Sequence, residues 1–216
     1  MDERCIILDI GGVLEHTPRT GWIPYWEREL GLPPGTVDQR LEDVWHAGSI
    51  GAVDEAEVRR QVAARLRLAP PRTEAFMADF WTEYLGTPNV ELISHVRGLR
   101  RRARLGILSN SFVGAREREV SRYRFDELVE DAGHIVYSHE IGVEKPDPQA
   151  FERTCTILGV RAADCLFVDD HAPNVETALT LGMQAHLFDD NHRTIARIAE
   201  FLSAGGEFRS RRPMTH

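Results

Sequence analysis

The stretch at residues 6–16, IILDIGGVLEH, decides the fold of this chain. An apolar run ends at Asp9, and two glycines, Gly11 and Gly12, follow almost at once. A short, continuous apolar run is typical of a strand that is buried on both faces, as in a parallel sheet. The stretch therefore predicts a buried strand that carries a carboxylate and a glycine turn to one edge of a sheet.

Four more apolar runs indicate further buried strands, and helical patterns separate most of them. The five expected strands are residues 5–8, 104–108, 134–137, 165–168 and 184–188. One helix is expected to begin at Thr87-Pro88, with threonine as its N-cap, and another to begin at Asp147-Pro148 and end at Gly159. This alternation predicts an α/β fold with a Rossmann-like, doubly wound parallel sheet.

The segment between the first two strands is too long for one crossover, and its apolar residues recur at helical spacing. Thr36 with Gln39, and Asp54 with Glu57, have the spacing of capping boxes at helix starts. We therefore expect a helical bundle inserted straight after the first strand. The expected division is an α/β core of residues 1–14 and 87–205, a helical insert of residues 15–86, and a disordered tail of residues 206–216.

The composition excludes several classes of function. The 216 residues carry a net charge of −8, which argues against a nucleic-acid-binding surface. No apolar stretch approaches the ~18 residues of a membrane span, and the charged start MDERC does not resemble a signal peptide. The three cysteines form no CxxC pair, which indicates free thiols in a reducing compartment. We expect a cytoplasmic monomer or homodimer without nucleic-acid or membrane partners.

Polar residues follow the expected strands, and ligands of open parallel sheets bind at the carboxyl ends of the strands. In chain order these residues are Asp9, then Ser109 and Asn110, then Lys145, then Asp169 and Asp170 with Asn174. Clustered carboxylates repel one another unless a cation lies among them, and oxygen ligands suit Mg²⁺ together with a substrate phosphate. A carboxylate held near a phosphorus atom is what nucleophilic phosphoryl transfer through an aspartyl-phosphate requires.

These residues resemble the four motifs of the haloacid dehalogenase (HAD) superfamily. The matching segments are Asp9-Ile10-Gly11-Gly12-Val13, Leu108-Ser109-Asn110, Lys145-Pro146, and Phe167-Val168-Asp169-Asp170 with Asn174. The resemblance implies a Rossmann-like core with a helical C1 cap, inserted after the first motif, that closes over the site and selects the substrate. It also implies a Mg²⁺-dependent phosphatase that acts on a small phosphorylated metabolite.

The resemblance implies a role for each matching residue. Asp9 would be the nucleophile, Ser109 would hydrogen-bond the phosphoryl group, and Lys145 would orient Asp9. The implied metal ligands are Asp9, the backbone carbonyl of Gly11, Asp169 and Asp170, supported by Asn174. The substrate and its phosphate would contact Gly11, Gly12 and Asn110. His16 and Arg19, where the chain enters the insert, either line the substrate site or pack in the hinge.

Phosphatases of the family usually have a second aspartate two residues after the nucleophile, and this chain has Gly11 there. That aspartate protonates the leaving group and later activates water, and such help is typically worth ~10²–10⁴-fold in rate. We therefore expect slow turnover of ordinary esters or another proton donor, with His16 the nearest candidate and His46 a remoter one. A good leaving group, as in an acyl phosphate, needs no such acid.

Two other functions remain open from the sequence. A haloacid dehalogenase also works through an aspartyl ester, and Ser109-Asn110 fits that branch. Dehalogenases of this type need no metal, however, so Asp169-Asp170 favours the phosphatase. The third reading is a catalytically weak HAD-like protein that holds a phosphorylated ligand. The substitution Asp9→Asn separates this binding protein from the two enzymes, because the substitution would abolish turnover but spare ligand binding.

Overall fold

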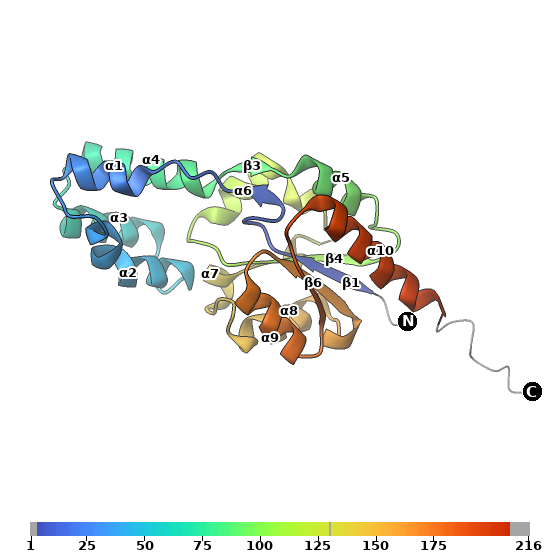
Figure 1. Cartoon of the computed structure of the whole chain (residues 1–216). Helices are drawn as coiled ribbons and strands as arrows, with labels where there is room; N and C mark the ends of the chain where they lie inside the picture. The colour runs from blue at the N-terminus through green and yellow to red at the C-terminus, as the bar shows by residue number, and fades with distance from the viewer. Residues whose placement is uncertain (1–3, 130, 208–216) are drawn as a thin grey trace, which may run out of the picture.

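The computed structural model describes residues 4–129 and 131–207, and within these ranges five strands form one parallel sheet (Figure 1). The strands are β1 (Cys5–Leu8), β4 (Arg104–Ser109), β5 (Ile135–Tyr137), β6 (Cys165–Asp169) and β7 (Gln184–Leu187). They lie in the order β5-β4-β1-β6-β7, and every neighbouring pair is parallel. The predicted α/β parallel sheet is confirmed, with strand ends that differ by at most one residue from those expected.

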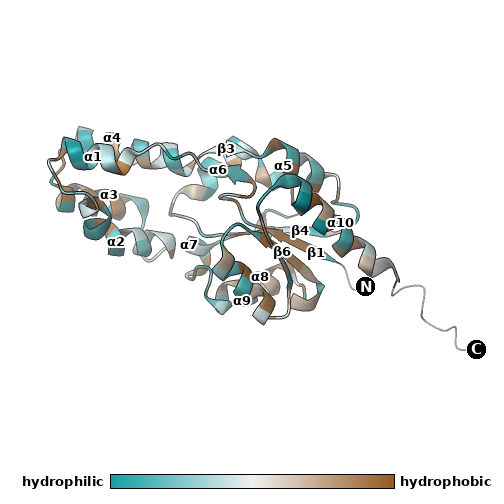
Figure 2. Cartoon of the chain, viewed as in Figure 1, coloured by the Kyte–Doolittle hydropathy of each residue, from teal (hydrophilic) through white to brown (hydrophobic). Residues whose placement is uncertain are grey.

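Helices cover both faces of the sheet, which explains why its strands are apolar throughout. Ile6 and Leu8 of β1 pack with α5 (Val90–Arg97) and α10 (Asn191–Glu207), whereas Cys5 and Ile7 pack with α8 (Pro148–Leu158) and α9 (Ala172–Thr180). Side chains alternate across a strand, so both faces of β1 must be apolar. The central strands are accordingly brown in Figure 2, whereas the helices around them show both hydrophilic and hydrophobic residues.

Four helices form the insert, which projects from the core on the side away from both chain ends (Figure 1). They are α1 (Trp22–Glu29), α2 (Thr36–Ser49), α3 (Glu55–Leu66) and α4 (Pro70–Tyr84). Their inner faces share an apolar cluster, rich in aromatic rings such as Trp22, Trp26 and Phe76, which Phe112 and Ala115 of the core also join. A two-stranded antiparallel ribbon, β2 (Glu15–His16) with β3 (Thr87–Pro88), joins the insert to the core.

The insert also touches the core at a second place, the end of α2. Ser49 donates a hydrogen bond of 2.7 Å to Glu144, and Ser138 donates one of 2.7 Å to the carbonyl of Ser49. Ser138 begins the short helix α7 (Ser138–Ile141). Arg118 on α6 (Ala115–Tyr123) forms an ion pair of 3.0 Å with Glu55 on α3. These contacts hold the insert over the carboxyl edge of the sheet.

The helix start predicted at Thr87-Pro88 is wrong. These residues form β3, which pairs with β2. Helix α5 begins at Val90 instead, and the side chain of Asn89 accepts a hydrogen bond of 3.4 Å from the Leu92 amide. A short asparagine side chain caps as well as threonine does, and pairing with the returning chain draws Thr87 into the ribbon.

The capping box predicted at Thr36 is also wrong. Thr36 is the first residue of α2, and Gly35 holds the N-cap position without a side chain to offer. The Val37 amide donates a hydrogen bond of 3.0 Å to Glu27 of α1 instead. A carboxylate from a neighbouring helix thus satisfies the free N–H group that a capping box would have served.

Other helix ends lie where the sequence predicts them. Asp54 caps α3 by accepting a hydrogen bond of 2.7 Å from the Glu57 amide. Asp147 caps α8, and Gly159 ends that helix in the left-handed conformation. The last helix, α10, reaches Glu207, beyond the predicted core boundary at residue 205. The remainder of the predicted tail, residues 208–216, lies outside the described residues.

Three short 3₁₀ turns connect these elements. They are Phe125–Glu127, Ala132–His134 and Ala162–Asp164. Among residues 4–129 and 131–207, no helix has both the length and the apolar character that crossing a membrane would require.

Candidate active site

The carboxyl ends of the three central strands bring the predicted site residues to one edge of the sheet. Leu8, the last residue of β1, is paired with Ile107 of β4 and with Val168 of β6. Because the strands are parallel and in this register, Asp9 and Asp169 emerge at the same level, and Ser109 lies one residue further along β4. The sheet therefore assembles residues that lie far apart in the sequence.

Three carboxylates meet at this edge. Asp9, Asp169 and Asp170 each offer one oxygen atom, and these atoms lie within 4.8 Å of one another. Asp9 and Asp169 are buried, whereas Asp170 is exposed. Such a spacing lets the three carboxylates share one small cation.

Lys145 balances part of this negative charge. Its Nζ atom lies 2.8 Å from Asp9 and 2.7 Å from Asp169, and only 1% of its side chain is exposed. Burial acts to lower the pKa of the ammonium group, but the two adjacent carboxylates prevail and raise it above its usual range. Lys145 is therefore a fixed positive charge that joins the nucleophile position to the acidic pair.

Burial also changes the acids themselves. It raises the pKa of Asp9 to about 6, with Lys145 opposing the rise and Asp169 adding to it. The pKa of Asp170 is raised as well, first by partial burial and then by the neighbouring Asp169. These carboxyls are easier to protonate than free ones, so a cation bound among them would compete with protons.

Asp169 is held by several donors. It accepts hydrogen bonds from Lys145 at 2.7 Å, from the His171 amide at 2.8 Å and, at both of its oxygens, from the side-chain amide of Asn174 at 3.0 Å. The supporting position predicted for Asn174 is thus beside Asp169. Asp169 is thus engaged by three donor groups, whereas Asp170 is exposed.

The side chain of Asn110, predicted to contact the phosphate, is engaged by the backbone of Lys145. Its amide oxygen accepts a hydrogen bond of 2.7 Å from the Lys145 amide, and its Nδ2 donates one of 2.7 Å to the Lys145 carbonyl. Both polar ends are therefore used to fix the backbone of Lys145. The neighbouring Ser109 is 2% exposed, and its hydroxyl makes a long contact of 3.4 Å with the Asn110 carbonyl.

A cavity of about 520 Å³ opens beside the carboxylates. It is lined by Gly11, Gly12, His16, Thr17, Pro18, Arg19, Glu83 and Asp170. The structure thus places the predicted substrate residues His16 and Arg19 on the same cavity as Asp170. The other candidate proton donor, His46, lies elsewhere, with its Nδ1 atom 3.5 Å from Glu144.

Gly12 is required by its surroundings. Its φ is +74°, and a Cβ atom there would lie 2.0 Å from an oxygen of Asp170. Any side chain would therefore displace this carboxylate and strain the turn. The glycine keeps the turn after β1 tight against the acidic pair.

The sequence did not point to Glu15, which the structure buries next to the site. Glu15 is 2% exposed and accepts a hydrogen bond of 3.2 Å from the Thr17 hydroxyl. Burial raises its pKa to about 7, with smaller effects from Thr17, Gly86 and Asp9. The available signal was an acid that directly continues the apolar pair Val13-Leu14.

A second buried acid, Glu119 on α6, lies behind the site. Tyr137 donates a hydrogen bond of 2.6 Å to it. Burial raises the pKa of Glu119 to about 7, opposed by hydrogen bonds from Tyr137 and Tyr84 and reinforced by Glu15 and Asp9. Glu119 thus belongs to the electrostatic surroundings of Asp9, although nothing in its local sequence indicates this.

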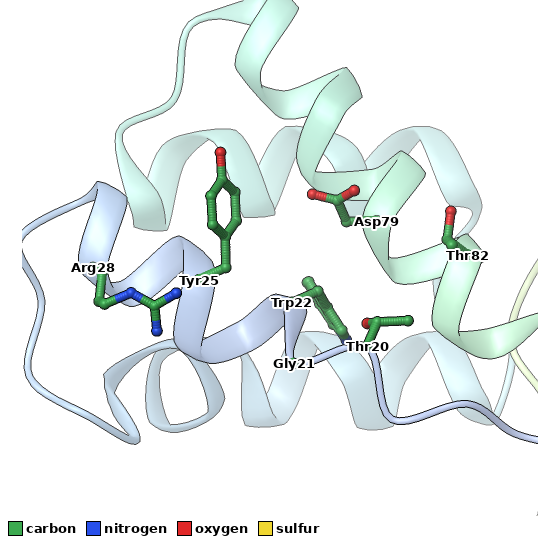
Figure 3. Close-up of a pocket in the computed structure, with 7 residues that line it drawn as sticks. All are labelled: Thr20, Gly21, Trp22, Tyr25, Arg28, Asp79 and Thr82. Carbon is green, nitrogen blue, oxygen red and sulfur yellow. The ribbon is translucent and has the colours of Figure 1, made fainter.

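A second hollow, of about 460 Å³, lies on the insert and away from the carboxylates (Figure 3). Tyr25 and Arg28 on α1 lie on one side of it, and Asp79 and Thr82 on α4 lie on the other. Asp79 already accepts a hydrogen bond of 2.8 Å from the Trp26 indole. The residues that line this hollow include none of those predicted for catalysis.

The parallel sheet, its helical insert and the acid–lysine cluster define a hydrolase with a Rossmann-like core. More particularly, the chain belongs to the haloacid dehalogenase-like hydrolases, because the model of that family matches residues 3–182. The match covers all the strand ends from β1 to β6 at which the site is built.

Individual relatives agree with this assignment. The chain is 29% identical over 217 residues to "Phosphatase MT3486" of Mycobacterium tuberculosis (strain CDC 1551 / Oshkosh), covering 95% of this chain and 96% of the relative. A HAD family enzyme of Bacteroides thetaiotaomicron, solved as a magnesium complex, superposes with a TM-score of 0.72 at 19% identity, over 88% of this chain and 94% of that one. A 2-haloacid dehalogenase of Pseudomonas syringae pv. Tomato DC3000 superposes with a TM-score of 0.64 at 16% identity, over 94% and 99%. These two structures share the fold.

Proposed function

We propose that this hydrolase is a Mg²⁺-dependent phosphatase that acts on a small phosphorylated metabolite through an aspartyl-phosphate on Asp9. The observation that carries the proposal is the position of Lys145, which lies within 2.8 Å of Asp9 and 2.7 Å of Asp169 while Asp170 shares the same cluster. The similarity to a protein named as a phosphatase supports it.

The donor set fits a divalent cation. Asp9, Asp169 and Asp170 carry three negative charges when ionised, and Lys145 carries one positive charge, which leaves two to be balanced. Carboxylate oxygens are the ligands that Mg²⁺ prefers, and the exposed Asp170 leaves room for water or a substrate oxygen. We assign Asp9, Asp170 and the carbonyl of Gly11 as direct ligands, with Asp169 beside them. When bound, the ion neutralises phosphoryl oxygens and makes the phosphorus more electrophilic.

The chain's own residues supply the rest of the chemistry. A carboxylate oxygen of Asp9 attacks the phosphorus, the phosphorus–oxygen bond to the leaving group breaks, and the phosphoryl group passes to Asp9. We propose that Lys145, 2.8 Å from Asp9, fixes the attacking carboxylate and that the Ser109 hydroxyl binds a phosphoryl oxygen. The insert covers this edge of the sheet, and we propose that it acts as the cap that limits access of bulk water.

The substrate is constrained by two features of the cavity. Arg19 and His16 line it, which favours a substrate with an anionic group besides the phosphate. Gly11 supplies no proton, so we propose that good substrates have a leaving group that is stable as an anion, such as the carboxylate of an acyl phosphate.

We also propose a cytoplasmic location. The thiols of Cys5, Cys155 and Cys165 are free, which is typical of proteins in a reducing compartment.

One observation favours a second candidate function. The missing acid at position 11 also fits a protein that holds a phosphorylated ligand and turns it over poorly. The dehalogenase alternative has less support, because the clustered Asp169 and Asp170 have no role in a reaction without a metal.

The proposed function is tested with a screen of phosphorylated metabolites, with and without Mg²⁺, beside Asp9→Asn. We expect Mg²⁺-dependent phosphate release that Asp9→Asn abolishes. Ligand binding without turnover by the unmodified protein would favour the binding module. Halide release from a 2-haloacid in the absence of Mg²⁺ would favour the dehalogenase.

A further inference from the structure

The position that usually carries the acid–base residue is open in this chain. Gly11 is not among the glycines with positive φ, so its backbone would accept a side chain. A Cβ atom at Gly11 would meet one atom within 4 Å in the described part of the chain, the Thr17 hydroxyl oxygen at 3.8 Å. The side of Gly11 where an acid would lie therefore faces the hydroxyl of Thr17.

The Thr17 hydroxyl is held in a defined orientation. Its hydrogen is donated to Glu15 over 3.2 Å. Glu15 cannot move easily, because it is buried and its backbone is paired with Pro88. Its Oε1 atom also lies close to Gly86, since a Cβ atom on that glycine would be only 1.8 Å from it. With its hydrogen directed to Glu15, Thr17 has only lone pairs to offer to the cavity that it lines together with Gly11.

We infer that the Thr17 hydroxyl accepts a hydrogen bond from the water molecule that hydrolyses the aspartyl-phosphate on Asp9. The inference rests on the proposed function and deepens it. The missing acid–base residue would have served twice, as the acid for the leaving group and as the acceptor for this water. Thr17 takes over the second task, and Glu15 is the positioning residue that orients it.

The step balances without a further base. The water oxygen forms a bond to phosphorus while the bond between phosphorus and the Asp9 oxygen breaks. The electron pair of the broken bond returns to the Asp9 carboxylate. One hydrogen of the water stays on the new hydroxyl group, and the other passes to a phosphoryl oxygen. The products are the carboxylate of Asp9 and dihydrogen phosphate.

The test separates formation of the phosphoenzyme from its hydrolysis. Rapid-quench experiments with acetyl phosphate or p-nitrophenyl phosphate and Mg²⁺ measure both rates. In Thr17→Val we expect unchanged formation, about tenfold slower hydrolysis, as for the loss of one neutral hydrogen bond, and a higher steady-state level of phosphoenzyme. Thr17→Ser keeps the hydroxyl and restores the hydrolysis rate.

Two further variants make the test specific. Thr20→Val is the matched control. Thr20, like Thr17, lies between β2 and α1 and donates its hydroxyl hydrogen to a glutamate, Glu83 on α4, but it does not face Gly11. It should leave hydrolysis unchanged. Glu15→Gln should slow hydrolysis in the presence of Thr17 but add nothing to Thr17→Val, since Glu15 acts through that hydroxyl. A merely structural role of Glu15 would give additive losses.

The possible outcomes distinguish the inference from the proposed function. Turnover through a phosphoenzyme whose hydrolysis is the same in Thr17→Val as in the unmodified protein overturns the inference and leaves the proposed function standing. The same conclusion follows if Thr20→Val slows phosphoenzyme hydrolysis as much as Thr17→Val does. Absence of any Mg²⁺-dependent phosphoenzyme in the unmodified protein overturns both.

Discussion

Substitution of Lys145 by methionine is the most informative single perturbation of the site. It removes the ammonium group that lies 2.8 Å from Asp9 and 2.7 Å from Asp169, and water cannot take its place because the side chain is 1% exposed. Loss of one partner from a buried ion pair costs about 3–5 kcal/mol, since the remaining charge stays buried. Two carboxylates are left here, so we expect a loss near the upper end, about 5 kcal/mol of unfolding free energy at about pH 8.

The loss should depend on pH in a definite direction. The folded-state pKa of Asp9 is raised to about 6, so its protonation contributes stability at low pH that is lost as the pH rises through that value. Without Lys145 this pKa rises further, because the ammonium group opposes protonation. The cost of Lys145→Met should therefore be smaller at about pH 5 than at about pH 8, by at least about 1.4 kcal/mol, the value of one pKa unit.

Urea denaturation followed by circular dichroism, in buffer with a chelator, measures both values. The double variant Lys145→Met with Asp169→Asn is the control, because removing one of the two buried charges that Lys145→Met leaves unpaired should recover part of the loss. A loss of unfolding free energy below about 1 kcal/mol at about pH 8 would refute the reasoning, because so small a loss is typical of solvent-exposed ion pairs. Equal losses at the two pH values would refute it as well.

Three other predictions test separate parts of the structure. Burial raises the pKa of Glu119 from 4.5 to about 7, so its stabilising effect, about 3 kcal/mol, is present at low pH and lost as the pH rises through about 7. As the pH rises from about 5 to about 8, the unfolding free energy of Glu119→Gln should therefore increase relative to that of the unmodified protein in urea titrations. A difference that stays the same at both pH values would contradict this. Gly12→Ala should weaken Mg²⁺ binding at least tenfold by calorimetry, because its Cβ atom would lie 2.0 Å from the Asp170 carboxylate; unchanged binding would exclude Asp170 as a ligand. Asp54→Ala should cost about 1 kcal/mol in thermal unfolding through loss of the α3 cap, while Mg²⁺ affinity stays the same.

The sheet was predictable from the sequence because its strands are apolar on both faces. Runs such as residues 165–168 show no alternation, and helices cover both of their sides in the structure. The convergence of Asp9, Lys145 and Asp169 was predictable for a related reason, since parallel strands end at one edge. These features depend on local pattern and on the geometry of the fold class.

The features that the sequence did not reveal depend on contacts between distant segments. Asn110 uses both ends of its amide on the backbone of Lys145, which lies in another loop. Thr36 does not cap its helix because Glu27 of the preceding helix binds the free amide of Val37. No pattern within a few residues of Asn110 or Thr36 indicates such a partner, so composition and spacing could not identify these roles.

Trapping of the phosphoenzyme tests the central claim most directly. The protein is mixed with acetyl phosphate and Mg²⁺, quenched in acid and digested, and the peptides are analysed by mass spectrometry. We predict phosphate on Asp9 and its absence from Asp9→Asn and from samples without Mg²⁺. Steady release of phosphate with no phosphorylated Asp9, or phosphate on another residue, would contradict a reaction in which Asp9 is the nucleophile.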